Sequence, residues 1–114
     1  MINIIKIKSE TIAEVNSDDV IIKTVQDAVD LMGNCSYQGA YKIVIKEKNI
    51  IPEFFDLKTK IAGEILQKFS TYNMKLEIIG NFSKFTSKSL KDFIYESNKQ
   101  GRITFIDFKK NSNE

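Results

Sequence analysis

The segment that most constrains the fold of this chain runs from Lys42 to Gly80. Two short apolar runs, at residues 42–46 and 75–80, flank a stretch whose apolar residues have helical spacing. This order predicts a βαβ unit with two parallel strands. An elaborate connection, residues 47–59, follows the first of these strands. Because ligands and partners bind at the carboxyl ends of parallel strands, we expect the functional edge of the protein there.

The chain before this unit predicts a hairpin and a first helix. Residues 2–15 read as two strands around a short turn, whereas residues 20–22 fit either an edge strand or an extended lead-in. Thr24 is expected to cap a helix, with Asp27 completing a capping box. We expect this helix to end at Gly33-Asn34, because both residue types adopt the left-handed conformation readily.

Two further helices are predicted after the first strand of the βαβ unit. Pro52 fits the first position of a single helical turn, and Asp56 is expected to cap a longer helix that ends near Phe69. A last helix, ending near Asn98, leads into a final strand at residues 103–106.

These elements predict one α/β domain, residues 1–108, with a polar C-terminal tail at 109–114. A chain of 114 residues is long enough for one core and too short for two. We expect a mixed sheet in which an N-terminal hairpin precedes a βαβαβ arrangement, with about four to five strands and three to four helices. Ile45 and Ile78 are expected to be buried on central strands, because both lie in the middle of apolar runs.

The charged residues exclude several classes of function. The chain carries 17 basic and 15 acidic side chains, a net charge of +2, and Arg102 is its only arginine. A nucleic-acid interface needs a concentrated basic face and favours arginine, so we expect no nucleic-acid partner. The absence of histidine removes the commonest general base and metal ligand. We therefore assign no catalytic residue, no metal and no other cofactor.

The single cysteine and the absence of long apolar runs indicate the compartment. Cys35 has no partner for an internal disulfide, which favours the reducing cytosol. With no histidine to activate it, we expect a small half-buried side chain rather than a nucleophile. No signal peptide is recognisable, and no apolar run approaches the roughly 18 residues of a membrane span. The sequence predicts a cytoplasmic protein with no membrane partner.

A family likeness begins after the first βαβ strand. An aspartate, then a small hydroxyl residue and a glycine-containing helix, resembles the STAS domain of anti-sigma-factor antagonists and sulfate-transporter tails. The matching stretches are Phe55-Asp56-Leu57-Lys58-Thr59-Lys60-Ile61-Ala62-Gly63-Glu64-Ile65-Leu66 and Asn81-Phe82-Ser83-Lys84. The resemblance implies a regulatory protein-binding domain in which Thr59 takes the place of a phosphorylatable serine. Leu57-Lys58 stands where that family carries two serines, which inserts one residue before Thr59.

The whole chain is also similar to a bacterial family of uncharacterised proteins, a domain of unknown function. The stretches that carry this likeness are residues 25–32, 34–39, 51–59 and 92–98. This resemblance implies family membership and no particular activity.

Eight residues in the loops 47–59 and 81–87 form the predicted site. They are Glu53, Phe54, Phe55, Asp56, Lys58, Thr59, Asn81 and Ser83. Loop carboxylates could hold a cation or act as an acid–base pair, although helix N-termini favour acidic residues in any case. Lys58-Thr59 fits either an anion site or a solvated first turn.

The adjacent aromatics Phe54 and Phe55 allow two interpretations. In a short turn we expect one of the two rings to point outward, where it could anchor a partner. The alternative is that both pack over the end of the sheet. Tyr37 is a further aromatic of interest, in a loop at the other end of the strands.

The sequence therefore predicts a cytosolic regulatory module that binds another protein through the 47–59 and 81–87 loops. A homodimer is a further option for the partner. The alternative is a binder of small molecules or anions, or an enzyme without a recognisable motif. That alternative would use Glu53, Asp56, Lys58 and Asn81 at the same edge.

Overall fold

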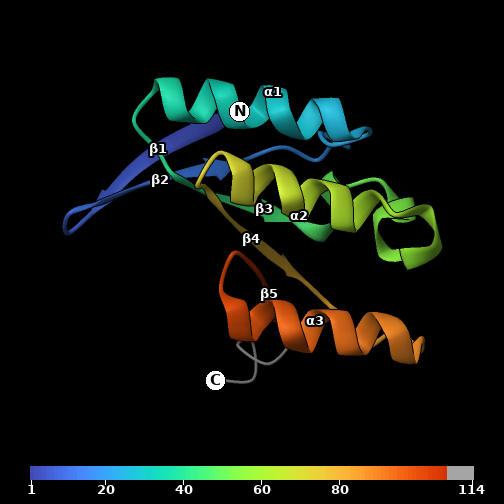
Figure 1. Cartoon of the computed structure of the whole chain (residues 1–114). Helices are drawn as coiled ribbons and strands as arrows, with labels where there is room; N and C mark the ends of the chain where they lie inside the picture. Colours follow the sequence, from blue (N-terminus) through green and yellow to red (C-terminus); the bar gives the residue numbers. More distant parts are fainter. Residues whose placement is uncertain (108–114) are drawn as a thin grey trace.

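A computed structural model describes residues 1–107 of the chain, so the predicted tail at 109–114 and the domain end at residue 108 lie outside the described residues (Figure 1). The elements in chain order are β1 (Ile2–Ile7), β2 (Glu10–Val15), α1 (Val25–Tyr37), β3 (Lys42–Lys46), the 3-10 turns η1 (Glu47–Asn49), η2 (Pro52–Phe55) and η3 (Leu57–Thr59), α2 (Ile61–Thr71), β4 (Lys75–Gly80), α3 (Lys88–Gln100) and β5 (Ile103–Asp107). The expected α/β class, with a hairpin followed by βαβαβ, is confirmed.

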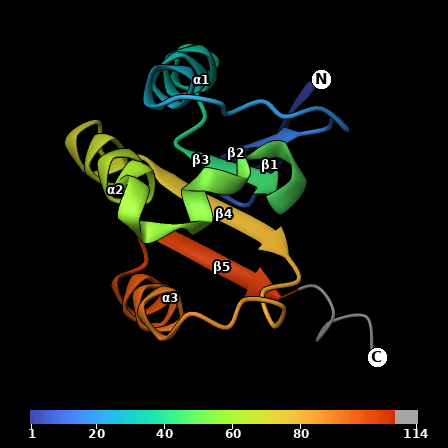
Figure 2. The same ribbon diagram turned by 90° about the vertical axis from the view of Figure 1, so that its right-hand side faces the viewer.

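One mixed sheet with strand order β1-β2-β3-β4-β5 organises the molecule. β1 and β2 pair antiparallel, and the remaining neighbours are parallel. Because each crossover moves one strand along and right-handed crossovers are the rule, all three helices are expected on the same face. Figure 2 shows α1, α2 and α3 together on that face. Among residues 1–107, no helix covers the opposite face.

The core lies between the sheet and these helices. Ile45 and Ile78 are 1% and 0% exposed on β3 and β4, as predicted. Their neighbours Val44, Glu77 and Ile79 point to the uncovered face and are half-buried. Alternate residues of the central strands therefore differ in burial because only one face of the sheet is covered.

Helix α1 begins as predicted and ends later than predicted. The Thr24 hydroxyl accepts a hydrogen bond from the Asp27 amide at 3.0 Å, and the Asp27 carboxylate accepts one from the Thr24 amide at 3.1 Å. The expected stop at Gly33-Asn34 is wrong, since the helix continues to Tyr37. Cys35, 0% exposed, extends the buried stripe by one turn, and this burial outweighs the weak helix propensity of glycine and asparagine.

Helix α2 also begins later than predicted. The expected single turn at Pro52 is present as η2, but Asp56 caps only the short turn η3, by accepting from the Lys58 amide at 3.2 Å. Lys60 then adopts a left-handed conformation with φ 67°, which interrupts the helix before Ile61. A helix capped at Asp56 is therefore wrong, because the chain must turn once more to bring Ala62 and Ile65 into the core.

Candidate functional site

The two predicted loops meet at the carboxyl ends of β3 and β4, and Glu47 joins them. One Glu47 carboxylate oxygen accepts a hydrogen bond from the Asn81 amide at 3.3 Å, and the other pairs with the Lys84 ammonium. Gly80 permits this approach, because a β-carbon there would lie 2.6 Å from the Glu47 β-carbon. The junction depends on a residue outside the eight of the predicted site.

The two adjacent phenylalanines are both buried. Phe54 and Phe55 are 1% and 7% exposed, so the expectation that one ring points outward is wrong. The rings pack edge to face with centroids 4.9 Å apart, and Phe55 stacks on Phe85 of the second loop at 5.0 Å. Phe82, from the same loop, packs against Phe105 of β5 at 5.4 Å. These contacts hold both loops onto the core, which is the alternative that the sequence left open.

The polar members of the predicted site bond within their own loops. The Thr59 hydroxyl lies 2.8 Å from the carbonyl oxygens of both Glu53 and Asp56, and it accepts from the Ile61 amide at 3.3 Å. The Asn81 side-chain oxygen accepts from the Ser83 hydroxyl at 2.8 Å. Within residues 1–107, no hydrogen bond or ion pair joins the predicted site residues of one loop to those of the other, and the contact between the loops is made by Glu47.

Of the eight predicted residues, Glu53, Asp56, Lys58 and Ser83 are exposed, and Thr59 and Asn81 are half-buried. A hollow of about 450 Å³ does lie at this edge. It is lined by Lys46, Glu47, Lys48, Ile79 and Gly80, none of which belongs to the predicted eight. The predicted residues therefore share a side of the molecule without converging on one cavity.

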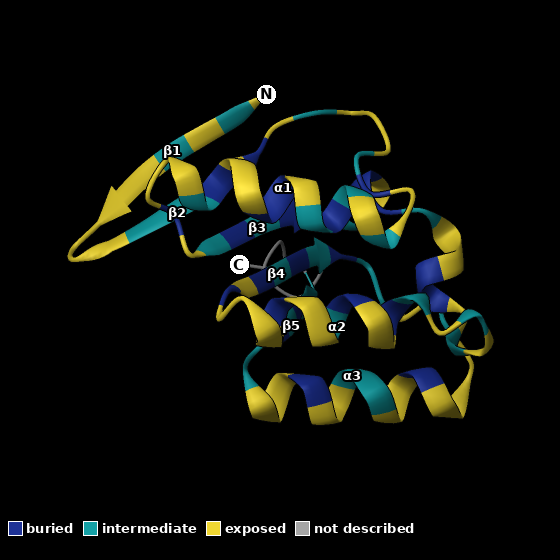
Figure 3. Cartoon of the chain, turned by 45° about the horizontal axis from the view of Figure 1, so that its top comes forward, coloured by how far each residue is buried: buried dark blue, intermediate teal, exposed yellow. Residues whose placement is uncertain are grey.

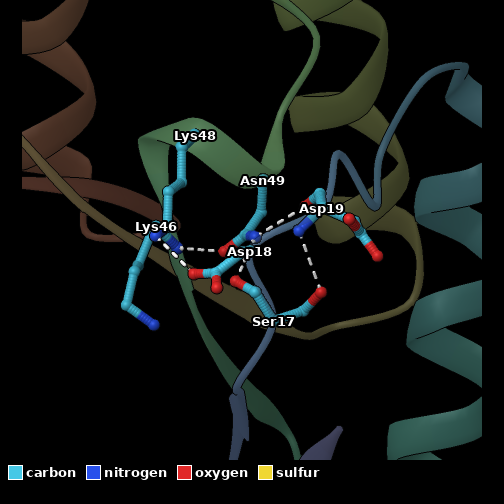
Figure 4. A network of polar contacts seen from close by, with 6 residues as sticks. All are labelled: Ser17, Asp18, Asp19, Lys46, Lys48 and Asn49. Atoms are coloured by element: carbon cyan, nitrogen blue, oxygen red, sulfur yellow. Dashed lines mark hydrogen bonds and ion pairs between the residues drawn. The ribbon is translucent and has the colours of Figure 1, made fainter.

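A buried asparagine that the sequence did not indicate anchors the neighbouring loop (Figure 4). Asn49 is 0% exposed, and its amide donates to the carbonyl oxygens of Ser17 and Asp19 at 2.9 and 2.7 Å. Its side-chain oxygen accepts from the Lys46 amide at 3.1 Å. One side chain thus satisfies three backbone groups and ties residues 17–19 to the end of β3. The signal in the sequence was a single amide beside the apolar pair Ile50-Ile51.

Electrostatic effects at this edge are local. The Lys48 ammonium donates to the Asp18 carboxylate at 2.7 Å, and this hydrogen bond and charge hold the pKa of Asp18 below its ordinary value. Burial raises the pKa of the Cys35 thiol, which keeps the thiol protonated and unreactive. Among residues 1–107, no three histidine, cysteine, aspartate or glutamate side chains are grouped so that they could hold a metal ion.

A second surface lies at the opposite ends of the strands, where α1 and α2 finish. Tyr37, Tyr41 and Tyr72 are 93%, 62% and 54% exposed. They line one groove of about 520 Å³, together with Val29, Met32, Gly33, Ser36 and Met74. We call this surface the tyrosine groove. Its lining contains no charged side chain, although 28% of the residues in the chain are charged.

Sequence reasoning drew attention to Tyr37 and missed Tyr41 and Tyr72. Tyr37 is the last residue of α1, Tyr41 directly precedes β3 and Tyr72 directly follows α2. The parallel arrangement of β3 and β4 brings these element boundaries together (Figure 1). The signal available was their common position at the boundary of an element, combined with a turn residue, Gly39 or Asn73, close by.

Comparison with known proteins gives the family of the chain. None of the helices in residues 1–107 has the length and apolar character that a membrane span requires. No curated protein and no solved structure matches the chain. The family model described as a domain of unknown function (DUF4180) matches residues 7–114, and the chain therefore belongs to that family.

Proposed function

We propose that this protein is a binding module for another protein and that the tyrosine groove is its main contact surface. The observation that carries the proposal is the exposure of three tyrosines, 93%, 62% and 54%, around a single uncharged groove. Tyrosine is enriched among the residues that dominate binding energy, since its ring supplies a large contact area and its hydroxyl stays hydrogen-bonded. Three such residues gathered on one surface are what an interface would use.

The lining of the groove indicates the chemistry of the partner. Met32 and Met74, both 2% exposed, form an apolar base, and their flexible thioethers adapt to different shapes. No acid or base in the lining could pair with a charged ligand group, and burying an unpaired charge is costly. The groove therefore fits an uncharged, extended segment of a partner, such as one rich in proline and aliphatic residues.

In this proposal the loop edge contributes to the rate of association and not to the main contact. Its exposed residues are Glu53, Asp56, Lys58 and Ser83. Its exposed charges lie on a framework that the phenylalanine cluster holds rigid. Charged groups at the rim of an interface act chiefly on the rate of association. A STAS-like regulatory role in the cytosol, the role that the sequence resemblance implied, is consistent with partner binding at either surface.

Partner capture with matched variants tests this proposal. Immobilised native protein would capture partners from the lysate of its source cells, and the captured proteins would be compared by quantitative mass spectrometry. We expect Tyr37→Ser and Tyr72→Ser each to weaken capture by about 2 kcal/mol, roughly 30-fold. Tyr95→Ser is the matched control, because Tyr95 is 63% exposed and lies outside the groove lining.

The same experiment separates the two surfaces. If Lys58→Glu and Asp56→Lys abolish capture while both groove variants retain it, the loop edge is the contact surface and the tyrosine groove is not. Equal capture by all four variants would overturn protein binding at either place.

A small-molecule or anion site is the second candidate, and the 450 Å³ hollow at Lys46 and Lys48 favours it. Lys46, Glu47 and Lys48 surround a base formed by Ile79 and Gly80. Because Glu47 pairs with Lys84 and Lys48 with Asp18, Lys46 is the side chain that would meet an anion with an apolar body. Amide chemical-shift changes on titration with a panel of carboxylates and phosphates would test it. Shifts confined to residues 46–48 and 79–80, and lost in Lys46→Ala, would support this function.

A further inference from the structure

The two outer strands of the sheet, β1 and β5, differ in whether the backbone amides and carbonyls on their outer edges have hydrogen-bond partners. On β5, the Asn98 side chain of α3 accepts from the Phe105 amide at 2.7 Å and donates to the Phe105 carbonyl at 3.3 Å. One side-chain amide thus makes the pair of bonds that a residue of a neighbouring strand would make. The β5 edge is partly closed by the chain itself.

The β1 edge has no such cover. The Asn16 amide donates to the Met1 carbonyl at 2.6 Å, so these two residues form a hydrogen-bonded pair of the β1–β2 ladder. Since bonded and non-bonded pairs alternate, the amides and carbonyls of Ile2, Ile4 and Lys6 point away from β2. Among residues 1–107, no hydrogen bond reaches these groups, and Figure 3 shows β1 as the outermost strand, with a largely exposed surface.

Four of the six residues of β1 are isoleucines, and the other two, Asn3 and Lys6, are exposed. Ile5 and Ile7 are 36% and 52% exposed, and Ile2 and Ile4 are half-buried. An unpaired apolar edge strand is a template for a further strand, and proteins usually protect such edges. The contrast with β5 indicates that β1 is left open for pairing.

We propose that β1 pairs antiparallel with β1 of a second copy of this chain, with the two-fold axis passing between the two Ile4 residues. Ile2 of one copy then lies opposite Lys6 of the second, and the outward groups of all three residues pair on both strands. About six new backbone hydrogen bonds result. The two sheets become one continuous sheet, with the helices of both copies on the same face.

The strand is self-complementary in this register, because every outward-facing residue meets an outward-facing residue of the second copy, and its charge disfavours the neighbouring register. With Ile4 opposite Ile4, the two Lys6 side chains are separated by four residues, about 14 Å along the strand. That distance exceeds the roughly 8 Å over which physiological salt screens charge. Moving the axis to Lys6 would oppose the two lysines directly, which is destabilising. On the uncovered face, Ile7 of one copy lies opposite Met1 of the second and covers apolar surface.

This pairing is independent of the tyrosine groove and of the proposed function. β1 lies almost entirely before residue 7, where the family match begins, so the pairing is inferred for this chain and not for the family. The groove lies at the ends of α1 and α2 and remains accessible in the paired form, because its lining includes no residue of β1.

Site-specific cross-linking tests the register. The residues of a hydrogen-bonded pair lie about 5.5 Å apart between α-carbons, which suits a disulfide. We expect Ile4→Cys alone to form a covalent dimer under mild oxidation, and Lys6→Cys alone to form none. Mixing Ile2→Cys with Lys6→Cys should give the mixed dimer. The native chain is the control, since Cys35 is 0% exposed.

Sedimentation of the full chain over a dilution series up to ~1 mM tests the association itself. Ile4→Pro removes one outward amide without touching the ladder to β2, and we expect it to weaken self-association at least tenfold. Ile5→Thr, which keeps the outward backbone groups, should leave it within about twofold. A thermal melt checks that each variant is folded. A native chain that stays monomeric throughout, or a dimer that Ile4→Pro leaves intact, would overturn the proposal.

Discussion

The two ends of the parallel strands carry different aromatic residues, and their exposure is opposite. At the carboxyl ends, Phe54 and Phe55 are buried, and Phe82 and Phe85 pack onto Phe55. At the amino ends, the three tyrosines of the groove are all more than half exposed. A phenyl ring has no group that can hydrogen-bond to water, whereas a tyrosine hydroxyl can stay hydrated while its ring contacts a partner. The elaborate end of the molecule thus buries its aromatic side chains, and the plainer end leaves its aromatic side chains exposed.

Truncating one aromatic from each end gives the largest expected difference. Phe54→Ala should lower the free energy of unfolding by about 3–5 kcal/mol, because the ring is almost fully buried and its removal leaves a cavity. Tyr37→Ala, at a site 93% exposed, should change it by no more than about 0.5 kcal/mol. Urea denaturation followed by circular dichroism measures both. Comparable losses in the two variants would remove the distinction between a packed end and a contact end.

The next largest change in stability is expected at Gly80, where the two loops meet. Gly80→Ala should destabilise the fold by about 1–3 kcal/mol, since the new methyl group would push Glu47 away from Asn81. Gly63→Ala is the matched control, because no atom lies within 4 Å of its added β-carbon and it occupies an exposed helix position. That control should stabilise the protein by about 0.5–1 kcal/mol. If Gly80→Ala is neutral, the loops are not joined as tightly as the structure indicates.

Removing the buried side-chain amide of Asn49 should lower the free energy of unfolding by a similar or smaller amount. Asn49→Ala leaves the Ser17 and Asp19 carbonyls without their donor, a loss of about 1–3 kcal/mol. Gln38→Ala, at an exposed amide bonded only to Asn34 near the tyrosine groove, should stay within about 0.5 kcal/mol. Hydrogen exchange of the Ile21 and Ile22 amides, which donate to the Asn49 carbonyl, should accelerate in Asn49→Ala. Unchanged exchange there would mean that other contacts hold this loop.

Regular elements were predictable from the sequence because their signals are local. Short apolar runs located β3 and β4, and Thr24 with Asp27 located the start of α1. The ends of α1 and α2 were not predictable by the same means. Whether Cys35 joins the core, or Lys60 turns left-handed, depends on where the sheet lies relative to each helix. Tertiary packing overrides local propensity at such positions.

The candidate site was only partly predictable. The sequence indicated correctly that the loops 47–59 and 81–87 lie together, because consecutive parallel strands end at the same edge. It could not show that Phe85 would cover Phe55, since that contact joins loops 30 residues apart. The tyrosine groove likewise combines three positions far apart in the chain, which only the relative placement of α1 and α2 brings together.

The smallest expected effect is electrostatic and concerns the ion pair between Asp18 and Lys48. It tests whether charges at the carboxyl-end edge influence groups outside that pair. Lys48 holds the pKa of Asp18 below 3.8, its ordinary value, first through a hydrogen bond and second through its charge. A folded-state pKa below the unfolded value contributes stability that is present above the unfolded pKa and is lost as pH falls through the folded one. Both side chains are largely exposed, so the contribution is small and should weaken further in 1 M salt. An NMR titration of the Asp18 carboxyl should give a pKa below 3.8 in the native protein that rises toward the ordinary value in Lys48→Met, where only the weaker effect of the Lys46 charge still lowers it. If the pKa stayed as low in that variant as in the native protein, the ion pair with Lys48 would not be the main cause, and residues 17–19 would be coupled electrostatically to more of this edge.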